Sequence, residues 1–479
     1  MSQLKPAELW QMSPSEFNKW RRENDLKLLF DSFQKGLPHF DDWLNSNNLS
    51  IDFILSTDKP GQFFYWDKNV YCEKSIKGEF TRYAFYQVYD EKQEQDLLKS
   101  LDKPKEGETT EYRKFTPYFV WVKEIKGIAK PVKTRYSGDW DTFRYVLGNA
   151  AESPEHCEWV ITPGVTVLKL GGTRIESWLS LYGRNLDFTN LDFLEIEGKG
   201  SWSTGIEIFY SHCANMKLMN VEANFAEFYE CYFMKLSVYN SRLYGITLTR
   251  CELFQSYFEN VSISSLLIIH SAVSGLSFNR VETDTIYYFP PKKHYYESQS
   301  MSNETISKNF KQLRVLYQSN GMRQEASESY YKERLYEMKG LWAKSQLLKA
   351  TTYVRKYSWS YAWEQFKKSA IILVKFLSNF ISYAIWGFGE RPLRILATAL
   401  LIILSFSFIY MASPINHVSG DFINSLYFSV VTFTTLGYGD ISPMSSGAPI
   451  HKILVAIEAL AGAFCMGLIV AGFANKSRH

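Results

Sequence analysis

Strong charge of either sign is absent from this chain of 479 residues, and cysteine is scarce. The net charge of +3 gives no reason to expect a nucleic-acid partner or an acidic tail. The six cysteines include no Cys-x-x-Cys pair, which excludes the zinc and redox motifs built on that spacing. The first residues, MSQLKPAELWQMSPSEF, lack the apolar stretch of a secretory signal peptide. We therefore expect most of the chain to lie in a reducing cytoplasm.

Patterns that carry catalysis are also missing. The sequence shows no nucleophile, base and acid set, no metal-ligand cluster and no phosphate loop, since LGGTR near Gly171 is too short to indicate one. No apolar helix carries arginine at every third position, so we expect no voltage sensor. We therefore expect no enzyme, no catalytic residues and no cofactor.

Residues 1–180 are mixed and aromatic, which indicates a small α+β module. MSPSEFNKWRRE predicts a helix start, with Ser13 as the N-cap, Pro14 at the first helical position and Glu16 closing a capping box. YFVWVKEI, from Tyr118, predicts a strand. The sequence leaves open whether this module binds a small-molecule or a protein regulator.

Residues 184–288 follow a five-residue period. From Ile208 to Phe278, fifteen consecutive positions at this spacing are apolar. At the overall hydrophobic content of 46%, such a run in a chosen phase arises by chance about once in 10⁵ cases, so an internal repeat is the better explanation. A second column, two residues earlier in each repeat, holds small or aliphatic residues.

The two columns resemble those of the pentapeptide-repeat family. The resemblance implies a right-handed, four-sided β-helix with four repeats per turn, so that residues twenty apart stack about 4.8 Å apart. Cys231 would then stack on Cys251, with Ser211 and Ser271 in the same ladder. Two cysteines this close could form a disulfide or bind a metal. We favour plain packing, because the column accepts small residues in general.

Some pentapeptide solenoids mimic DNA through an acidic surface. Residues 181–290 hold twelve Asp and Glu against seven Lys and Arg, a net of −5. This mild charge favours a scaffold, and no nucleic-acid partner is expected.

Residues 302–365 predict a helical hairpin, and residues 369–388 a further helix. The hairpin contains two amphipathic helices broken at Asn320-Gly321. We interpret its apolar stripe as packing against the solenoid end or the partner helix, with a ligand groove as the alternative. The helix at 369–388 is apolar with one polar stripe. A striped helix lies in the membrane interface more readily than it spans, and a spanning or a buried soluble helix are the alternatives.

Two apolar runs predict an outer membrane helix at 393–413 and an inner one at 450–474. The first contains eighteen residues without a charge, and the second contains twenty-one with one acid, Glu458. Basic residues flank the pair on one side, which predicts that both termini are cytoplasmic. These residues are Arg391, Arg394, Lys476 and Arg478.

Between these runs, within residues 421–443, lies TFTTLGYGDISP. Non-helical backbone survives at membrane depth only where protein or water satisfies its polar groups, and a re-entrant loop after a short helix meets that condition. A dehydrated cation needs closely spaced oxygens, and a strand that turns successive carbonyls to one side needs glycine at unusual φ values.

TLGYG resembles the potassium-channel signature, and YFSVVTFTTLGYGDISP resembles the pore helix, filter and exit of that superfamily. The resemblance implies four such loops around one axis, in a homotetramer with potassium as the permeant ion. Carbonyls, together with the hydroxyl of Thr435, would line the ion sites. The resemblance assigns the selectivity filter to Thr435, Leu436, Gly437, Tyr438 and Gly439.

Around this filter the resemblance implies further roles. Asp440 shapes the outer mouth with Gly439, and Thr434 supports the filter from the end of the pore helix. Leu436 replaces the commoner valine, which we expect to be harmless because its side chain faces away from the ion. Apart from the permeant ion, no metal site is expected.

The inner helix, APIHKILVAIEALAGAFCMGLIVAGFANK, is similar to the inward-rectifier branch, especially its bacterial members. The resemblance implies that Gly462 is a gating hinge. The alternative role of this glycine is tight helix packing, and it can have both roles at once. We expect Glu458 to make a structural hydrogen bond behind the filter, with an ion-attracting ring as the alternative. Met466 lines the cavity where strong rectifiers have an acid, so strong rectification is not implied. Six residues follow Phe473, the end of the apolar run, so we expect no C-terminal regulatory domain.

These patterns predict a multidomain membrane protein of the plasma membrane, of bacterial inner-membrane type, embedded in a lipid bilayer. We expect a potassium-selective homotetrameric channel gated by the N-terminal cytoplasmic assembly. The alternative is a membrane-anchored scaffold with little conduction, whose solenoid recruits a protein partner. The sequence does not indicate the gating stimulus or the physiological role.

Overall fold

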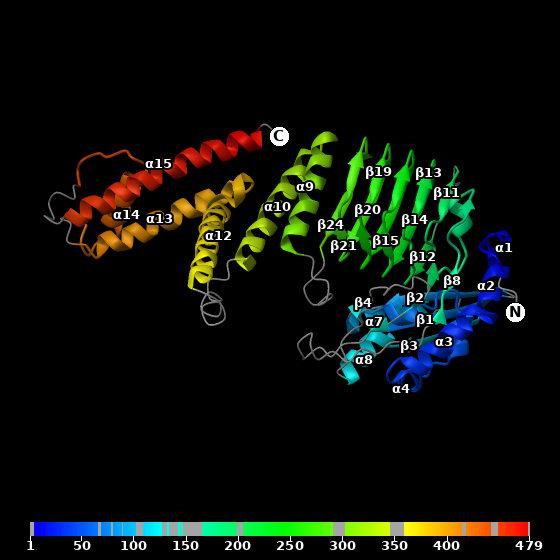
Figure 1. Cartoon of the computed structure of the whole chain (residues 1–479). Coiled ribbons are helices and arrows are strands. Elements are labelled where there is room, and N and C mark those ends of the chain that lie inside the picture. Colours follow the sequence, from blue (N-terminus) through cyan, green and yellow to red (C-terminus); the bar gives the residue numbers. More distant parts are fainter. Residues whose placement is uncertain are drawn as a thin grey trace. The chain divides into compact units, whose positions relative to one another are not determined.

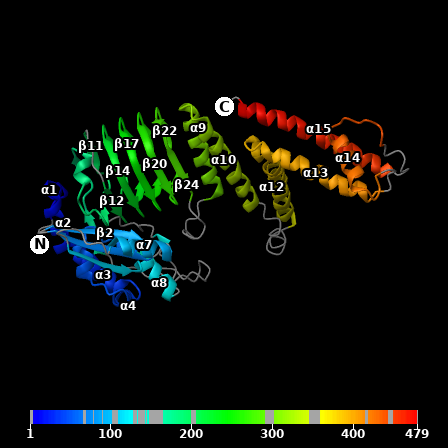
Figure 2. The same cartoon turned by 180° about the vertical axis from the view of Figure 1, so that it is seen from behind.

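The computed structural model divides into two compact units, Met1–Met301 and Ser302–His479 (Figures 1 and 2). The residues that the structure describes are 4–65, 69–77, 80–88, 90–101, 109–126, 132–133, 142–143, 145–146, 165–198, 205–290, 302–344, 359–413, 418–441 and 449–477.

Short helices open the first unit, and a small antiparallel sheet with strand order β2-β1-β3 follows. Helix α2 starts as predicted, because Ser13 Oγ accepts a hydrogen bond from the Glu16 amide and the Glu16 carboxylate accepts one from the Ser13 amide at 2.9 Å. The elements are α1 (Pro6–Gln11), α2 (Pro14–Glu23), α3 (Asp25–Gly36), α4 (Phe40–Ser46), α5 (Ile51–Ser56), α6 (Gln62–Tyr65), β1 (Val70–Lys77), β2 (Phe80–Gln87), α7 (Glu91–Leu101), β3 (Thr109–Phe115), α8 (Tyr118–Lys126), β4 (Val132–Lys133), β5 (Thr142–Phe143), β6 (Tyr145–Val146) and β7 (Val165–Thr166).

The sequence YFVWVKEI, predicted to be a strand, forms helix α8 instead. Its buried side chains are spaced by one, three and four residues, which places them on one face of a helix. The Pro117 carbonyl accepts a hydrogen bond from the Trp121 amide at 2.9 Å and so starts the first turn. The prediction was wrong because the aromatic composition suggested a strand, whereas the apolar spacing is helical. The buried side chains are Tyr118, Phe119, Trp121 and Val122.

A parallel β-solenoid completes the first unit. Its sheets include the strand orders β22-β19-β16-β13-β11-β9, β12-β14-β17-β20-β23 and β15-β18-β21, and β24 pairs with β20. From β12 onward most partners are offset by twenty residues, so Leu218 pairs with Val238, and Val238 pairs with Phe258, whereas β11 pairs with β13 at an offset of 22. The elements are β8 (Leu168–Lys169), β9 (Arg174–Ile175), η2 (Trp178–Leu181), β10 (Thr189–Asn190), β11 (Glu195–Glu197), β12 (Ile206–Phe209), β13 (Lys217–Met219), β14 (Glu222–Tyr229), β15 (Tyr232–Met234), β16 (Ser237–Tyr239), β17 (Arg242–Thr249), β18 (Glu252–Phe254), β19 (Tyr257–Glu259), β20 (Ser262–Ile269), β21 (Ala272–Ser274), β22 (Ser277–Asn279), β23 (Glu282–Thr283) and β24 (Ile286–Phe289).

The backbone of the solenoid turns at regular intervals. Every fifth residue from Tyr210 to Arg280 has a positive φ, and only Gly245 and Gly275 among them are glycines. Side chains rarely adopt this conformation, so a corner recurs with the same five-residue period as the apolar column. Every member of that column is buried except Phe278, which is half-buried.

The cysteine ladder of the solenoid serves packing. Cys231 and Cys251 are free and buried. The Ser211 amide lies 3.5 Å from Cys231 Sγ, and the Cys251 amide donates to Ser271 Oγ at 2.9 Å, so the predicted ladder of small residues forms. Among the residues that the structure describes, no group of three His, Cys, Asp or Glu could hold a metal ion. Cys157 lies outside the described residues.

The N-terminal helices and the first solenoid turns share one hydrophobic core. Phe188 stacks on Tyr210 with ring centroids 5.4 Å apart, and both belong to the solenoid side. The same Phe188 ring meets Phe30 of α3 at 6.4 Å and Phe64 of α6 at 5.8 Å, both edge to face. The core therefore runs without a break across residue 180, where the sequence suggested the end of a separate module.

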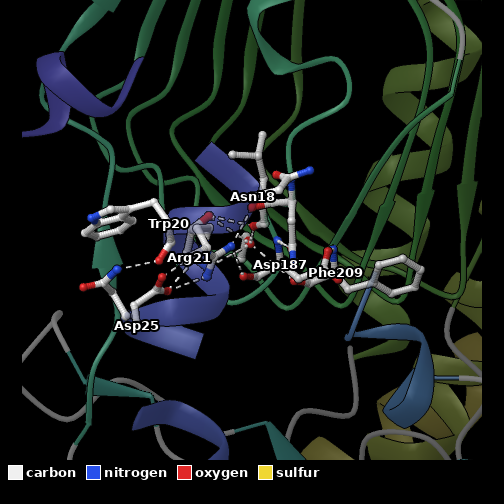
Figure 3. A network of polar contacts seen from close by, with 11 residues as sticks. Asn18, Trp20, Arg21, Asp25, Asp187 and Phe209 are labelled. Carbon is white, nitrogen blue, oxygen red and sulfur yellow. Dashed lines mark hydrogen bonds and ion pairs between the residues drawn. The ribbon is translucent and has the colours of Figure 1, made fainter. Parts of the chain in front are cut away.

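A buried arginine ties α2 to the solenoid (Figure 3). Arg21 is fully buried, pairs with Asp25 at 2.7 Å and donates to the backbone carbonyl of Asp187 at 2.9 Å. The carboxylate of Asp187 accepts hydrogen bonds from the amides of Gly61 at 2.9 Å and Phe209 at 3.0 Å. Burial raises the pKa of Asp187 to about 7, and the two amide hydrogen bonds oppose that rise.

We expect Arg21→Met to release α2 from the solenoid. Removing one partner of a buried ion pair leaves the other charge uncompensated and typically costs about 3–5 kcal/mol. Arg22→Met is the matched control, because Arg22 is more exposed and its pair with Asp58 is 3.4 Å long. Hydrogen exchange of α2 in the full-length chain should rise strongly in Arg21→Met and stay near wild type in Arg22→Met. Equal protection in both variants would contradict the anchoring role.

The second unit is helical. Helices α9 and α10 flank a turn at Asn320 and Gly321, and Gly321 has a φ of +72°. The two helices pack along each other, and α10 also packs on α12. Among the residues that the structure describes, three helices are long and apolar enough to cross a membrane, over Phe366–Gly389, Leu393–Met411 and Pro449–Ala474. The elements are α9 (Asn303–Ser319), α10 (Arg323–Lys344), α12 (Trp359–Trp386), η4 (Gly387–Gly389), α13 (Leu393–Met411), α14 (Phe422–Phe433) and α15 (Pro449–Ser477).

Helix α12 extends further toward the N-terminus than the predicted 369–388 segment. Its polar stripe is used in part for contact with α10, because Arg334 Nη2 donates to Asn379 Oδ1 at 2.7 Å. Ser382 Oγ accepts a hydrogen bond from Trp386 within the helix at 2.8 Å. Several of its large apolar side chains remain exposed, as a lipid-facing surface requires. These are Ile371, Val374, Leu377, Phe380 and Ile381.

Candidate functional site

The predicted pore helix is α14, which packs between α13 and α15 (Figures 1 and 2). Asp421 caps its N-terminus by accepting hydrogen bonds from the amides of Ile423 at 2.8 Å and Asn424 at 3.2 Å. Thr434 ends the helix, and its hydroxyl donates to the Val430 carbonyl at 2.7 Å. With twelve residues α14 is too short to span a bilayer, and its C-terminal dipole end points into the segment that follows.

The segment after α14 alternates its backbone conformation. Thr435, Gly437 and Gly439 have φ values of +57°, +55° and +80°, while Leu436 and Tyr438 between them do not have positive φ. In an ordinary strand successive carbonyls point to opposite sides, and alternating the sign of φ turns them toward the same side. Each backbone oxygen can then face one axis, which is the arrangement that replaces the water shell of a cation.

Side chains of this segment leave the backbone free. Leu436 is 59% exposed and Tyr438 is 67% exposed in the single chain. A Cβ added to Gly437 or Gly439 would meet no atom within 4 Å. The backbone conformation therefore favours glycine at both positions, and space within one chain does not impose it.

Asp440 is held by a tyrosine that the sequence argument did not identify. The Tyr427 hydroxyl of α14 donates to Asp440 Oδ2 at 2.8 Å, and Asp440 Oδ1 accepts from the Ile441 amide at 3.1 Å. Tyr427 lies thirteen residues earlier in the chain, so this contact ties the exit of the filter back to the pore helix. The predicted residues 442–443 lie outside the described residues.

Glu458 joins three helices behind the filter. It is fully buried, and its Oε2 accepts a hydrogen bond from the Tyr410 hydroxyl of α13 at 2.6 Å. Its Oε1 accepts a hydrogen bond from Ser429 of α14, and that serine is fully buried as well. Because both carboxylate oxygens have partners inside the protein, the geometry favours the structural hydrogen bond over the ion-attracting ring. Sequence reasoning identified the acid but not its partners, since Tyr410 lies in no motif and the pore-helix resemblance, which includes Ser429, gave that serine no role.

Replacing Glu458 distinguishes a structural hydrogen bond from an ion-attracting ring. Glu458→Leu strands the buried Tyr410 hydroxyl, and a buried unsatisfied group costs about 1–3 kcal/mol. The Ser429 hydroxyl keeps a partner, because it can still donate to the Ile403 carbonyl at 2.9 Å. Glu458→Gln keeps an accepting oxygen and most of the side-chain volume, so it should be clearly more stable to heat than Glu458→Leu. We expect thermal unfolding in detergent to rank wild type, Gln and Leu in that order. Equal loss of conductance in both variants with unchanged thermal stability would indicate an ion-attracting ring instead.

Gly462 lies at the closest contact between α15 and α14. A Cβ added there would lie 1.8 Å from the carbonyl oxygen of Phe433, which is the last residue of α14. Cys465, one turn further, is buried in the same contact, whereas Met466 is 51% exposed on another face. The close approach explains the glycine by packing, and helix α15 runs continuously through this position.

The first unit contains a separate groove of about 1180 Å³. It lies among α2, α3, α5 and strands β1 and β2, and charges of both signs line it. These include Arg22, Lys27, Lys74, Asp31 and Asp52.

Comparison with known proteins agrees with the geometry of the C-terminal region. A family model described as Ion channel matches residues 397–478, which include most of α13 and all of α14 and α15. A search of curated proteins finds no match for the chain. The family match supports an ion-channel domain at residues 397–478, and together with the three long apolar helices it supports a membrane protein.

Proposed function

We propose that this protein is a potassium-selective channel whose homotetrameric pore is gated by its N-terminal cytoplasmic assembly. The alternation of φ over Thr435–Gly439 carries the proposal, because it turns consecutive backbone oxygens to one side. The selectivity filter is the one assigned from the sequence: Thr435, Leu436, Gly437, Tyr438 and Gly439. Potassium ions are the permeant ligand.

Several copies are needed to complete such a pore. One segment offers oxygens from one side only, and a dehydrated cation needs them all around. Helix α15 exposes many large apolar side chains in the single chain, which neighbouring copies and lipid would cover. These are Ile453, Ile457, Leu460, Phe464 and Val470. Met466 would line the cavity of the pore. Gly462 would act as a gating hinge as well as a packing contact.

The cytoplasmic assembly is, in this proposal, a right-handed four-sided pentapeptide-repeat solenoid joined to the pore by the helical hairpin. The twenty-residue register and the corners at every fifth residue support four repeats per turn. Its stiffness would carry a displacement over a distance, since each turn touches only its neighbours. The groove of mixed charge in the first unit would suit a polar regulator. Both termini would be cytoplasmic, in a plasma membrane of bacterial inner-membrane type with an inward-rectifier-like pore.

The test is the reversal potential of the purified full-length protein in a bilayer with potassium on one side and sodium on the other. A value near the potassium equilibrium potential supports the proposal. A sodium-permeable current would overturn the filter assignment. Silence of both the full chain and a chain lacking residues 1–300 would instead favour an anchored scaffold with little conduction.

A further inference from the structure

The connection between α12 and the outer helix α13 is a strained elbow. Gly387, Phe388 and Gly389 have consecutive positive φ values of +58°, +59° and +90°. For Phe388 this left-handed conformation costs about 1–2 kcal/mol, which surrounding contacts must offset. Phe388 is nevertheless buried, with only 6% of its surface exposed. A strained and buried residue at a helix junction is a position where a change in contacts can alter the backbone.

The contacts that hold Phe388 come largely from α10. The Tyr331 ring of α10 lies 6.3 Å from the Phe388 ring, and the Arg334 guanidinium lies 5.7 Å over it. On the other side Tyr383 of α12 lies 5.9 Å away. The elbow conformation therefore depends on where α10 sits.

Tyr331 also contacts both arginines at the start of the outer helix. The Arg391 guanidinium lies 4.9 Å from its ring centroid and that of Arg394 lies 5.8 Å away. Arg394 donates to the Tyr331 hydroxyl at 3.3 Å and to the Tyr383 carbonyl at 3.1 Å. Glu328, one turn earlier on α10, pairs with Arg391 at 2.5 Å. Aromatic and charged contacts thus connect one face of α10 to the first turn of α13.

The elbow also connects to the pore helix α14 and the inner helix α15. Trp386, just before it, packs in the cluster that contains Phe433 at the end of the pore helix. Pro392, just after it, lies against Gly472 of α15, where an added Cβ would be 3.3 Å from the Pro392 Cβ. Trp386 therefore links the elbow to the cluster at the end of the pore helix, and Pro392 lies against the inner helix at Gly472.

We propose that residues 387–394 form a hinge through which α10 sets the open probability of the pore. This inference rests on the proposed channel function and names its regulatory joint. When α10 moves, Phe388 loses the Tyr331 and Arg334 contacts, the left-handed turn relaxes, and the start of α13 shifts against Gly472. Any regulator of the N-terminal assembly would act by moving α10.

The test is the open probability of full-length variants in bilayers with potassium on both sides. Tyr331→Leu removes the ring that joins Phe388 to both arginines. Tyr330→Leu is the matched control, because Tyr330 is the adjacent residue on α10 and its ring meets Arg314 of α9. We expect Tyr331→Leu to change open probability by about fivefold or more, the lower end of typical coupling between sites, and Tyr330→Leu to stay within about twofold of wild type.

A charge exchange tests the same joint without removing the half-buried Tyr331 ring. Glu328→Arg and Arg391→Glu should each change open probability by about twofold or more, since the pair is partly exposed, and the double exchange should return it to the wild-type value. Because these side chains are half-exposed, the variants should fold even where Tyr331→Leu does not.

Two results would overturn the hinge: open probabilities like wild type in Tyr331→Leu and both charge reversals, or equal effects of Tyr330→Leu and Tyr331→Leu. Reversal potentials recorded on the same channels separate this from the channel proposal. Selective current with unchanged gating would overturn the hinge alone, whereas a non-selective wild type would overturn the proposed function as well.

Discussion

Gly437→Ala should abolish selective potassium conduction. The φ of +55° at this position is left-handed, and for an alanine it costs about 1–2 kcal/mol in each copy. In a tetramer the four costs fall on one ring of carbonyl oxygens, so the sum of about 4–8 kcal/mol would rotate those carbonyls away from the axis. We expect potassium current to fall by about 100-fold or more, and any remaining current to lose its preference for potassium over sodium.

Gly420→Ala is the matched control for this substitution. Gly420 also has a positive φ, +76°, and a Cβ there would also meet no atom within 4 Å, but it lies in the turn before α14. The same backbone cost should therefore lower stability slightly and leave selectivity unchanged. The measurement is the reversal potential under potassium and sodium gradients. Wild-type selectivity in Gly437→Ala would remove the basis for assigning ion sites to this segment.

The solenoid shows why some of this fold is readable from sequence. In the solenoid the same contact recurs every twenty residues. Leu218, Val238 and Phe258 therefore lie in the same inward-facing environment, which favours the same kind of side chain at each position. The pattern is local and repeated, which makes it visible without any knowledge of distant contacts. The filter segment is equally local, since its glycines report backbone conformation directly.

Long-range contacts were not predictable in this way. Phe188 meets Phe30 and Phe64 across more than one hundred residues, and nothing in the sequence marks these rings as partners. Arg21 likewise reads as one of several surface arginines of an amphipathic helix, yet it is fully buried on the solenoid. Amphipathic spacing identifies which face of a helix is apolar, but it does not identify what covers that face.

The elbow escaped prediction for a different reason. The charged, proline-containing sequence at residues 389–394 indicates a break between two helices, but Phe388 does not signal a left-handed turn, because aromatic residues rarely adopt one. The contacts from Tyr331 and Arg334 of α10, together with the Tyr383 ring of α12, hold it there. The behaviour of Glu458 is intermediate, because an acid in an apolar run predicts a buried polar contact but does not name Tyr410 or Ser429.

Gly462→Ala should destabilise the pore domain by overpacking. In a helix interior alanine is normally favoured over glycine by about 1 kcal/mol. Here the new Cβ would meet the Phe433 carbonyl oxygen at 1.8 Å and its carbon at 2.7 Å, and a backbone group cannot move aside as a flexible side chain can. Relieving this contact must displace the end of α14, which leads directly into the filter through Thr434. We expect a loss of about 1–3 kcal/mol per copy, together with reduced selectivity.

Gly467→Ala, on the same helix, tests whether that loss comes from the contact. A Cβ at Gly467 would meet no atom within 4 Å in the chain, so the same substitution should stabilise α15 slightly through helix propensity. Thermal unfolding of the two variants in detergent should therefore shift in opposite directions from wild type, with Gly462→Ala the less stable. If Gly462→Ala unfolds like wild type but changes only open probability, the glycine acts as a gating hinge and its packing role is wrong. If both stability and selectivity fall together, the contact between α15 and Phe433 is what holds the filter in register.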